Sequence, residues 1–220
     1  MYKRQIYNGF DQLTYFPPHP DLVSDRFNLV HTGSLYKISM IDLALECIDR
    51  SISRQTAPAG FRLHHVGMVQ HLDDLREKPA YKSLLRQSLL ELQPDHIPAE
   101  QARQKMVGSN ALLLVDRYRE DGVIQLPAKV FEYIQTGRPI LVFTSPHSPL
   151  VDVLELSKIP SVCIFPSDSV PEQDRKIDSF WRLSAGPYKA SESYLESFSA
   201  EGQAAQLAEI LNSVCLKPAL

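Results

Sequence analysis

Short, uninterrupted apolar segments, each followed by a helical pattern, constrain the fold of this sequence more than any other feature. Buried strands are expected at residues 27–31, 61–68, 89–92, 111–115, 140–144 and 161–165. Helices are expected at residues 38–53, 72–85, 99–107, 127–136 and 150–157, with a closing amphipathic helix at 200–214. Strands that are continuously apolar are buried on both faces, as in parallel sheets. The sequence therefore predicts an α/β fold, a doubly wound Rossmann-like parallel sheet with helices on both faces.

Composition limits the number of cores and the kinds of partner. The 220 residues, 44% of them hydrophobic, are enough for one sizeable core. The longest apolar runs, residues 111–115 and 140–143, are far shorter than the roughly 20 residues of a membrane span, and the N-terminus lacks the apolar segment of a signal peptide. With 23 Lys and Arg against 26 Asp and Glu, we expect no nucleic-acid partner. These observations predict a cytoplasmic protein without a transmembrane segment.

Missing motifs exclude several enzyme classes. The sequence contains no G-x-x-x-x-G-K-[ST] phosphate loop, no G-x-G-x-x-G, no G-x-S-x-G and no H-E-x-x-H. The widely spaced Cys47, Cys163 and Cys215 are expected to be reduced thiols. His64 and His65 are adjacent on a predicted strand, so their side chains are expected on opposite faces and cannot share a metal ion. We therefore expect no metal site.

The first candidate ligand site is the turn after the first predicted strand. Thr32, Gly33 and Ser34 follow that strand directly, and ligands of open parallel sheets bind at the carboxyl ends of strands. A glycine lets a phosphate or sugar approach the backbone closely, and the flanking hydroxyls can donate hydrogen bonds. The alternative is a tight turn whose glycine serves only the backbone angles.

The second candidate is the start of the helix predicted at 127–136. Lys129 and Glu132 are three residues apart and share one helix face. A cation beside free helical N–H groups suits a diphosphate, and a carboxylate one turn later suits the paired hydroxyls of a ribose. The alternative is an exposed salt bridge between these two side chains.

The string LPAKVFEYIQTGRPILVF at residues 126–143 resembles the donor-site helix and following strand of group 1 (family 4-like) glycosyltransferases of the two-domain GT-B architecture. Those proteins typically carry the pattern P-x-K-x-x-E-Y-x-x-x-G-[KR]-P-I-L. Further segments agree in order and approximate spacing, namely IYNGFD at 6–11, FNLVHTGSLY at 27–36 and HIPAEQARQKMVGSNALLLV at 96–115. The resemblance covers nearly the whole chain and identifies it with the C-terminal, donor-binding half of such an enzyme.

The resemblance implies roles for individual residues. Gly33 and Ser34, next to Thr32, would contact the diphosphate and sugar, Lys129 would balance phosphate charge, and Glu132 would hold the ribose hydroxyls. The loop formed by His96, Ile97 and Pro98 would border the base through its main chain, and Leu126 is a further candidate for the donor site. The sequence departs from the pattern in two places. Ile124 stands where many relatives carry an earlier glutamate, and only Lys37 is near the first glycine turn, where relatives commonly carry both an arginine and a lysine.

The similarity also implies how the chain is divided. Residues 1–11 would be the remnant of an interdomain hinge, and residues 1–5 resemble translated adapter sequence. Residues 12–198 would form the nucleotide-sugar donor-binding domain and residues 199–220 the closing helix. The N-terminal acceptor domain would then be missing from this chain, which makes it half of a GT-B enzyme and inactive alone. The full-length enzyme is expected to be cytoplasmic or peripheral to the membrane.

The expected function is transfer of a hexosyl group from a nucleoside diphosphate sugar to an acceptor hydroxyl, with retention of configuration and without a metal or other cofactor. The sequence identifies no catalytic residue. Two alternatives stay open: a non-catalytic nucleotide-binding or interaction module, and a sugar-nucleotide epimerase of the same architecture. Trp181, Tyr188 and Tyr194 are candidates for either an exposed interface with the missing domain or a core aromatic cluster.

Overall fold

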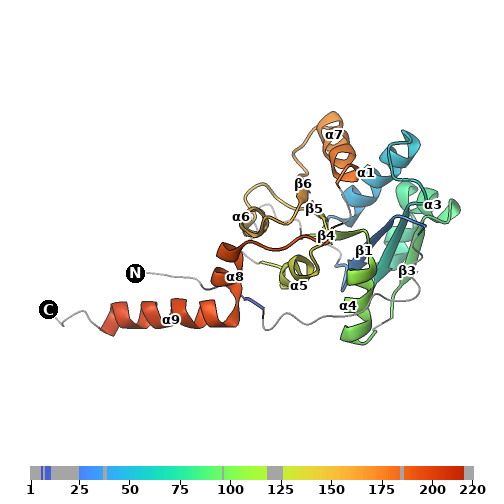
Figure 1. Cartoon of the computed structure of the whole chain (residues 1–220). Helices are drawn as coiled ribbons and strands as arrows, with labels where there is room; N and C mark the ends of the chain where they lie inside the picture. Colours follow the sequence, from blue (N-terminus) through green and yellow to red (C-terminus); the bar gives the residue numbers. More distant parts are fainter. Residues whose placement is uncertain are drawn as a thin grey trace.

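A single parallel sheet organises the described part of the chain. The computed structural model describes residues 6, 8–10, 25–36, 39–95, 97–117, 126–183 and 186–215. The sheet has six strands in the order β3-β2-β1-β4-β5-β6, and every neighbouring pair is parallel (Figure 1). The strands are β1 (Asn28–Thr32), β2 (Arg62–Val66), β3 (Leu90–Gln93), β4 (Ala111–Val115), β5 (Ile140–Phe143) and β6 (Ser161–Ile164). The predicted fold class, a doubly wound Rossmann-like parallel sheet, is confirmed.

Helices cover both faces of this sheet. They are α1 (Ile41–Ser53), α2 (Leu72–Arg76), α3 (Pro79–Arg86), α4 (Ala99–Gly108), α5 (Lys129–Thr136), α6 (Pro149–Ser157), α7 (Val170–Trp181), α8 (Glu192–Phe198) and α9 (Ala200–Cys215). One core contains buried side chains of α1, α2, α3 and α7, and the other contains those of α4, α5, α6 and α8. Helix α9 packs against α8 and extends away from the sheet (Figure 1). Among the described residues, no helix is both long enough and apolar enough to cross a membrane.

The structure corrects the expected helices in three places. The helix expected at 72–85 is two helices, because Pro79 starts α3 and the preceding Lys78 is extended, as the residue before a proline tends to be. Helices α7 and α8 were not predicted at all. In α7, most positions are polar, and its buried apolar side chains, Ile177, Phe180 and Trp181, lie near its C-terminal end.

The aromatic side chains near the C-terminus belong to the core. Trp181 is 9% exposed and packs edge-on against the rings of Phe27 and Phe61, whereas Tyr194 is fully buried and stacks on Phe10. Tyr188 is half-buried. The core alternative is therefore the correct one for Trp181 and Tyr194.

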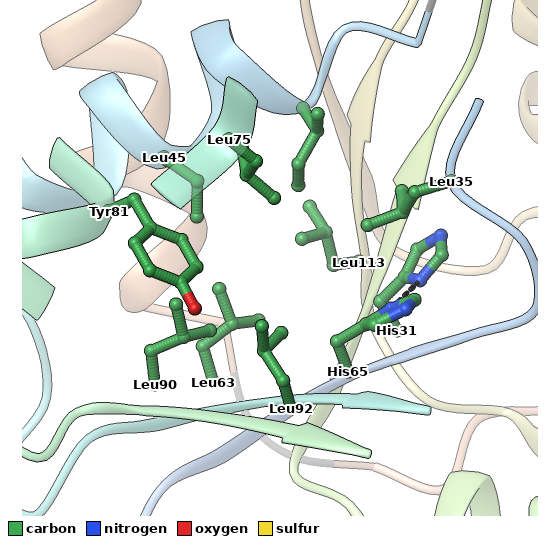
Figure 2. A pocket seen from close by; sticks show the side chains of 11 residues that line it. His31, Leu35, Leu45, Leu63, His65, Leu75, Tyr81, Leu90, Leu92 and Leu113 are labelled. Carbon is green, nitrogen blue, oxygen red and sulfur yellow. Dashed lines mark hydrogen bonds between the residues drawn. The ribbon is translucent and has the colours of Figure 1, made fainter. Parts of the chain in front are cut away.

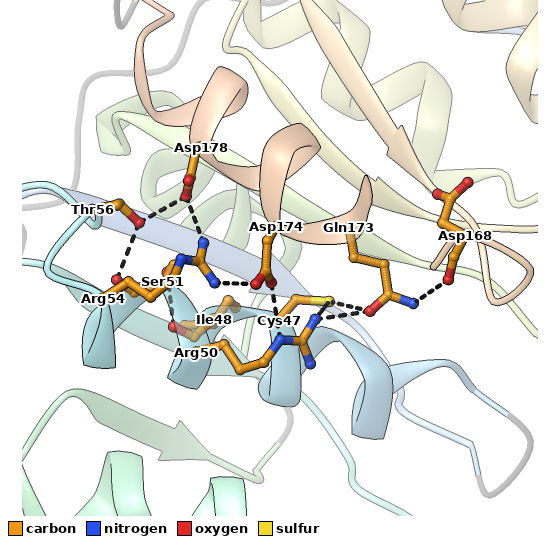
Figure 3. Close-up of polar contacts among 10 residues, drawn as sticks. All are labelled: Cys47, Ile48, Arg50, Ser51, Arg54, Thr56, Asp168, Gln173, Asp174 and Asp178. Carbon is orange, nitrogen blue, oxygen red and sulfur yellow. Dashed lines mark hydrogen bonds and ion pairs between the residues drawn. The ribbon is translucent and has the colours of Figure 1, made fainter. Parts of the chain in front are cut away.

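Polar contacts fix α7 across α1 (Figure 3). Arg50 of α1 donates to Asp174 at 2.9 Å and to Gln173 at 2.8 Å. Arg54 pairs with Asp174 at 2.6 Å and with Asp178 at 2.8 Å. These partly exposed charges form a network, which stabilises more than isolated surface pairs do.

The described cysteines are free thiols, as expected from their spacing. Cys47 is buried and Cys163 is half-buried, and burial raises the pKa of each thiol to about 11. Such thiols stay protonated at neutral pH and are poor nucleophiles. The side chain of Cys215 lies outside the described residues.

Candidate functional site

The strand order reverses between β1 and β4, and both candidate segments of the sequence lie there. Strands β2 and β3 extend the sheet on one side of β1, whereas β5 and β6 extend it beyond β4. In open α/β sheets, ligands bind in the crevice at the carboxyl ends of the strands where this reversal occurs. The turn containing Gly33 follows β1, and α5 is the first helix described after β4. The topology therefore places the two candidate segments at the same edge of the sheet.

The turn after β1 is fixed by two glycines. Gly33 has a φ of +95°, and its N–H donates to the carbonyl of Val66 at 2.7 Å. Gly67, which follows β2, has a φ of +132°, and a Cβ added there would lie only 2.6 Å from the carbonyl oxygen of Gly33. Both positions therefore require glycine, for the backbone angle and for the close approach of the two turns.

Lys129 lies on the other side of the same turn. A Cβ added to Gly33 would lie 2.6 Å from the Nζ atom of Lys129 and 2.8 Å from its Cε, so the lysine occupies the space that a side chain would need. Burial lowers the pKa of Lys129 to about 8, and the negative charge of Glu132 partly opposes that shift. The site thus holds a partly desolvated ammonium against a backbone turn without a side chain.

Tyr133 attaches the start of α5 to the sheet. Its fully buried hydroxyl accepts the backbone N–H of Thr32 at 2.9 Å and donates to the carbonyl of Leu113 at 3.2 Å. These bonds join the helix to the end of β1 and to the middle of β4. Burial raises the pKa of Tyr133 well above its ordinary value. The tyrosine of the K-x-x-E-Y pattern therefore explains why Lys129, one turn earlier, reaches Gly33.

The salt-bridge alternative for Lys129 and Glu132 is wrong. No ion pair joins these two side chains within the described structure. The Nζ atom of Lys129 is directed to the Nε2 atom of His31 at 3.5 Å, whereas Glu132 is exposed. The carboxylate is therefore open to solvent one turn after the lysine.

The other predicted site residues occupy different positions. Thr32 is 5% exposed and its hydroxyl lies 3.4 Å from both Met106 Sδ and Tyr133 Oη. This side chain therefore contacts the protein interior. Ser34 is half-buried in the turn itself. The side chain of Leu126 packs in the core beside α5.

Residues after β3 lie farther along the sheet. Ile97 is half-buried and precedes α4, at the carboxyl end of the edge strand β3. His96, Lys37 and Ile124 lie outside the described residues, so their expected positions stay predictions. The structure therefore brings together Gly33 and Lys129, whereas Ile97 follows β3, which is separated from β1 by β2.

Sequence reasoning missed two buried histidines at this edge. His31 of β1 and His65 of β2 are partners in the strand register, and their Nδ1 atoms are 2.8 Å apart (Figure 2). They lie at one end of an apolar pocket lined otherwise by leucine, isoleucine and tyrosine side chains. Nowhere in the described part of the chain do three His, Cys, Asp or Glu side chains gather to hold a metal ion. The sequence marks each histidine only by a glycine two residues later, Gly33 after His31 and Gly67 after His65, and this spacing does not specify that the two histidines pair.

Comparisons with known proteins concern the fold. No protein-family model matches the sequence, and no curated protein matches it significantly. Among solved structures, HepE from Anabaena in complex with UDP and glucose superimposes with a TM-score of 0.64 at 16% identity, over 94% of this chain and 56% of that one. The pneumococcal O-GlcNAc transferase GtfA, in complex with UDP and GlcNAc, gives a TM-score of 0.58 at 13% identity over 95% and 39%.

A third neighbour is WaaG, a glycosyltransferase involved in lipopolysaccharide biosynthesis. It has a TM-score of 0.50 at 14% identity, over 76% of this chain and 46% of that chain. The present chain spans about half the length of these structures or less. The chain therefore shares its doubly wound fold with part of each of these structures.

Proposed function

We propose that this chain is the donor-binding half of a group 1, family 4-like glycosyltransferase, and that it holds a nucleoside diphosphate sugar between β1 and α5. The observation that carries the proposal is the Lys129 ammonium held against the Gly33 turn at the point where the strand order reverses. A bound anion there would meet a cation, a bare backbone turn and the start of a helix. These are the features that diphosphates require.

The chemistry of glycosyl transfer suits this arrangement. As the bond between the sugar and the diphosphate breaks, negative charge develops on the leaving phosphate oxygen. Lys129, the first residue of α5, would stabilise that charge. Because a protein cation supplies this stabilisation, we infer that transfer proceeds without a metal ion. The exposed carboxylate of Glu132, one turn later, would accept hydrogen bonds from the two ribose hydroxyls.

Structural neighbours support the substrate class. HepE and GtfA were solved with UDP, together with glucose and GlcNAc respectively. We infer that residues 12–198 bind the donor, that residues 199–220 close the domain, and that residues 1–11 join it to an acceptor domain. Transfer of a hexosyl group, with retention of configuration, would require that acceptor domain. We place the complete enzyme in the cytoplasm or at a membrane surface.

Isothermal titration with UDP and with GDP tests the donor site. Lys129→Met should weaken binding by about 1.5–3 kcal/mol, the usual value of a hydrogen bond to a charged group. Glu132→Ala should weaken it by about 1–3 kcal/mol for the same reason. Matched controls are Lys189→Met, beyond the other end of α5, and Glu155→Ala on α6, both of which replace exposed charges.

Three results would contradict the proposal. The wild-type chain could bind neither nucleotide, the two site variants could bind as well as the wild type, or the controls could lose as much affinity as the site variants. In the last case, binding would depend on net charge instead of on this site.

A further inference from the structure

A chain of hydrogen bonds leads from Lys129 into the sheet. The Nζ atom of Lys129 is 3.5 Å from His31 Nε2, His31 Nδ1 is 2.8 Å from His65 Nδ1, and His65 Nε2 is 2.8 Å from the carbonyl oxygen of Gly67. The two rings are stacked with centroids 4.9 Å apart, and each histidine is at most 3% exposed. Figure 2 shows the pair and its dashed contact at the end of the apolar pocket. Every member of the chain is held by a strand end or by the start of α5.

The direction of each bond follows from the last acceptor. A carbonyl oxygen only accepts, so His65 carries its proton on Nε2. Burial lowers the pKa of His65 to about 4, so its Nδ1 has no proton and accepts from Nδ1–H of His31. The pKa of His31 is lowered well below its ordinary value by burial and by the neighbouring Lys129 charge. His31 is therefore neutral as well, and its Nε2 is left as an acceptor for Lys129.

We propose that His31 and His65 are positioning residues that aim the Lys129 ammonium at the Gly33 turn. This inference rests on the proposed role of Lys129 in diphosphate binding. A lysine side chain has four rotatable carbons, and an acceptor on a rigid ring removes much of that freedom. The acceptor is also uncharged. A carboxylate in its place would neutralise the ammonium, whereas an imidazole holds it and leaves its full charge for the phosphates.

The tautomers of the two histidines give a test that needs no nucleotide. In the ¹⁵N-labelled chain at pH 7, ¹⁵N–¹H correlation spectra should show both rings neutral, with the proton on Nδ1 in His31 and on Nε2 in His65. A proton on Nε2 of His31, or a charged ring at either position, would overturn the proposal. Its outcome does not depend on whether the chain binds UDP.

Binding measurements then test the effect on Lys129. His31→Leu and His65→Leu each place an apolar side chain at the end of an apolar pocket, where it is tolerated. Each variant should weaken UDP binding roughly three- to tenfold, as loss of an ordinary hydrogen bond does. His31→Gln, which can keep an acceptor toward the lysine, should recover most of the affinity. In His65→Leu, the spectra should also show His31 shifting toward its Nε2–H tautomer, because Nδ1–H has lost its acceptor.

A neighbouring histidine supplies the control. His64 of β2 points away from the pair and contacts Asn28 and Glu91, so His64→Leu should leave UDP binding unchanged. Wild-type affinity in both His31→Leu and His65→Leu would overturn the proposal. If the wild-type chain shows the expected tautomers but binds neither UDP nor GDP, the proposed donor site is wrong, whereas the hydrogen bonds from Lys129 through His31 to His65 are supported.

Discussion

Binding of UDP should depend on pH through the charge of Lys129. Burial lowers the pKa of this lysine to about 8 in the free protein. The groups that face it are Glu132 from α5, which raises its pKa, and the neutral His31 from β1. A bound diphosphate favours the charged lysine, so binding should be coupled to proton uptake near pH 8.

The size of the effect follows from the fraction of charged lysine. With a pKa of about 8, roughly nine-tenths of the lysine is charged at pH 7 and roughly one-tenth at pH 9. If the charged form is required, affinity should fall about tenfold over this range, or about 1.4 kcal/mol. An exposed lysine with an ordinary pKa would change affinity very little over the same interval. The terminal phosphate itself titrates near pH 6, so it is already about nine-tenths ionised at pH 7 and its charge changes little up to pH 9.

Titration calorimetry at pH 7, 8 and 9, in buffers of different ionisation enthalpy, measures both quantities. The wild-type chain should take up about half a proton per UDP at pH 8. Lys129→Arg, whose guanidinium stays charged, should show no comparable decline between pH 7 and 9. A wild-type affinity independent of pH, or an equal decline in the arginine variant, would refute the assignment of this titration to Lys129.

Three further predictions concern stability. Tyr133→Phe leaves two backbone groups without their buried partner and should lower the free energy of unfolding in urea by about 1–3 kcal/mol. Tyr194→Phe removes a buried hydroxyl that has no partner among the described residues and should leave the stability nearly unchanged. Equal losses of stability in the two variants would contradict the role of Tyr133. Gly67→Ala should both destabilise the chain and abolish UDP binding, because its Cβ would lie 2.6 Å from the Gly33 carbonyl oxygen in the neighbouring turn. Gly60→Ala is the control: its Cβ would lie 3.3 Å from the nearest atom in an exposed turn, so the variant should lose about 1 kcal/mol of stability and bind UDP normally. Asp174→Asn should cost about 1 kcal/mol at low salt and less in 1 M NaCl, and a loss independent of salt would argue against an ionic network.

The fold was largely predictable because its strands are buried on both faces. Short, continuously apolar segments such as Ala111–Val115 are typical of central strands, and the alternation with helices then indicates a parallel sheet. The errors arose where local pattern was weak. Helix α7 is mostly polar, with its buried apolar side chains near its C-terminal end, and α8 has only seven residues.

The site was predictable only in part. Gly33 and Lys129 could be selected because strand ends and helix starts meet at one edge of a parallel sheet. Their mutual contact could not, since it depends on Tyr133 joining α5 to two strands. The pairing of His31 with His65 depends on the register of β1 against β2, which sequence periodicity does not specify.

The contact between α1 and α7 has a consequence for the order in which the chain folds. Arg50 and its partner Asp174 are 124 residues apart, and Trp181 completes an aromatic cluster begun by Phe27 and Phe61. At 5–20 residues per second, synthesis from the end of α1 to the end of α7 takes about 6–26 s. During this interval, the nascent chain exposes apolar surface that α7 later covers. Because Trp181 is the chain's single tryptophan, its fluorescence reports the moment at which this surface closes.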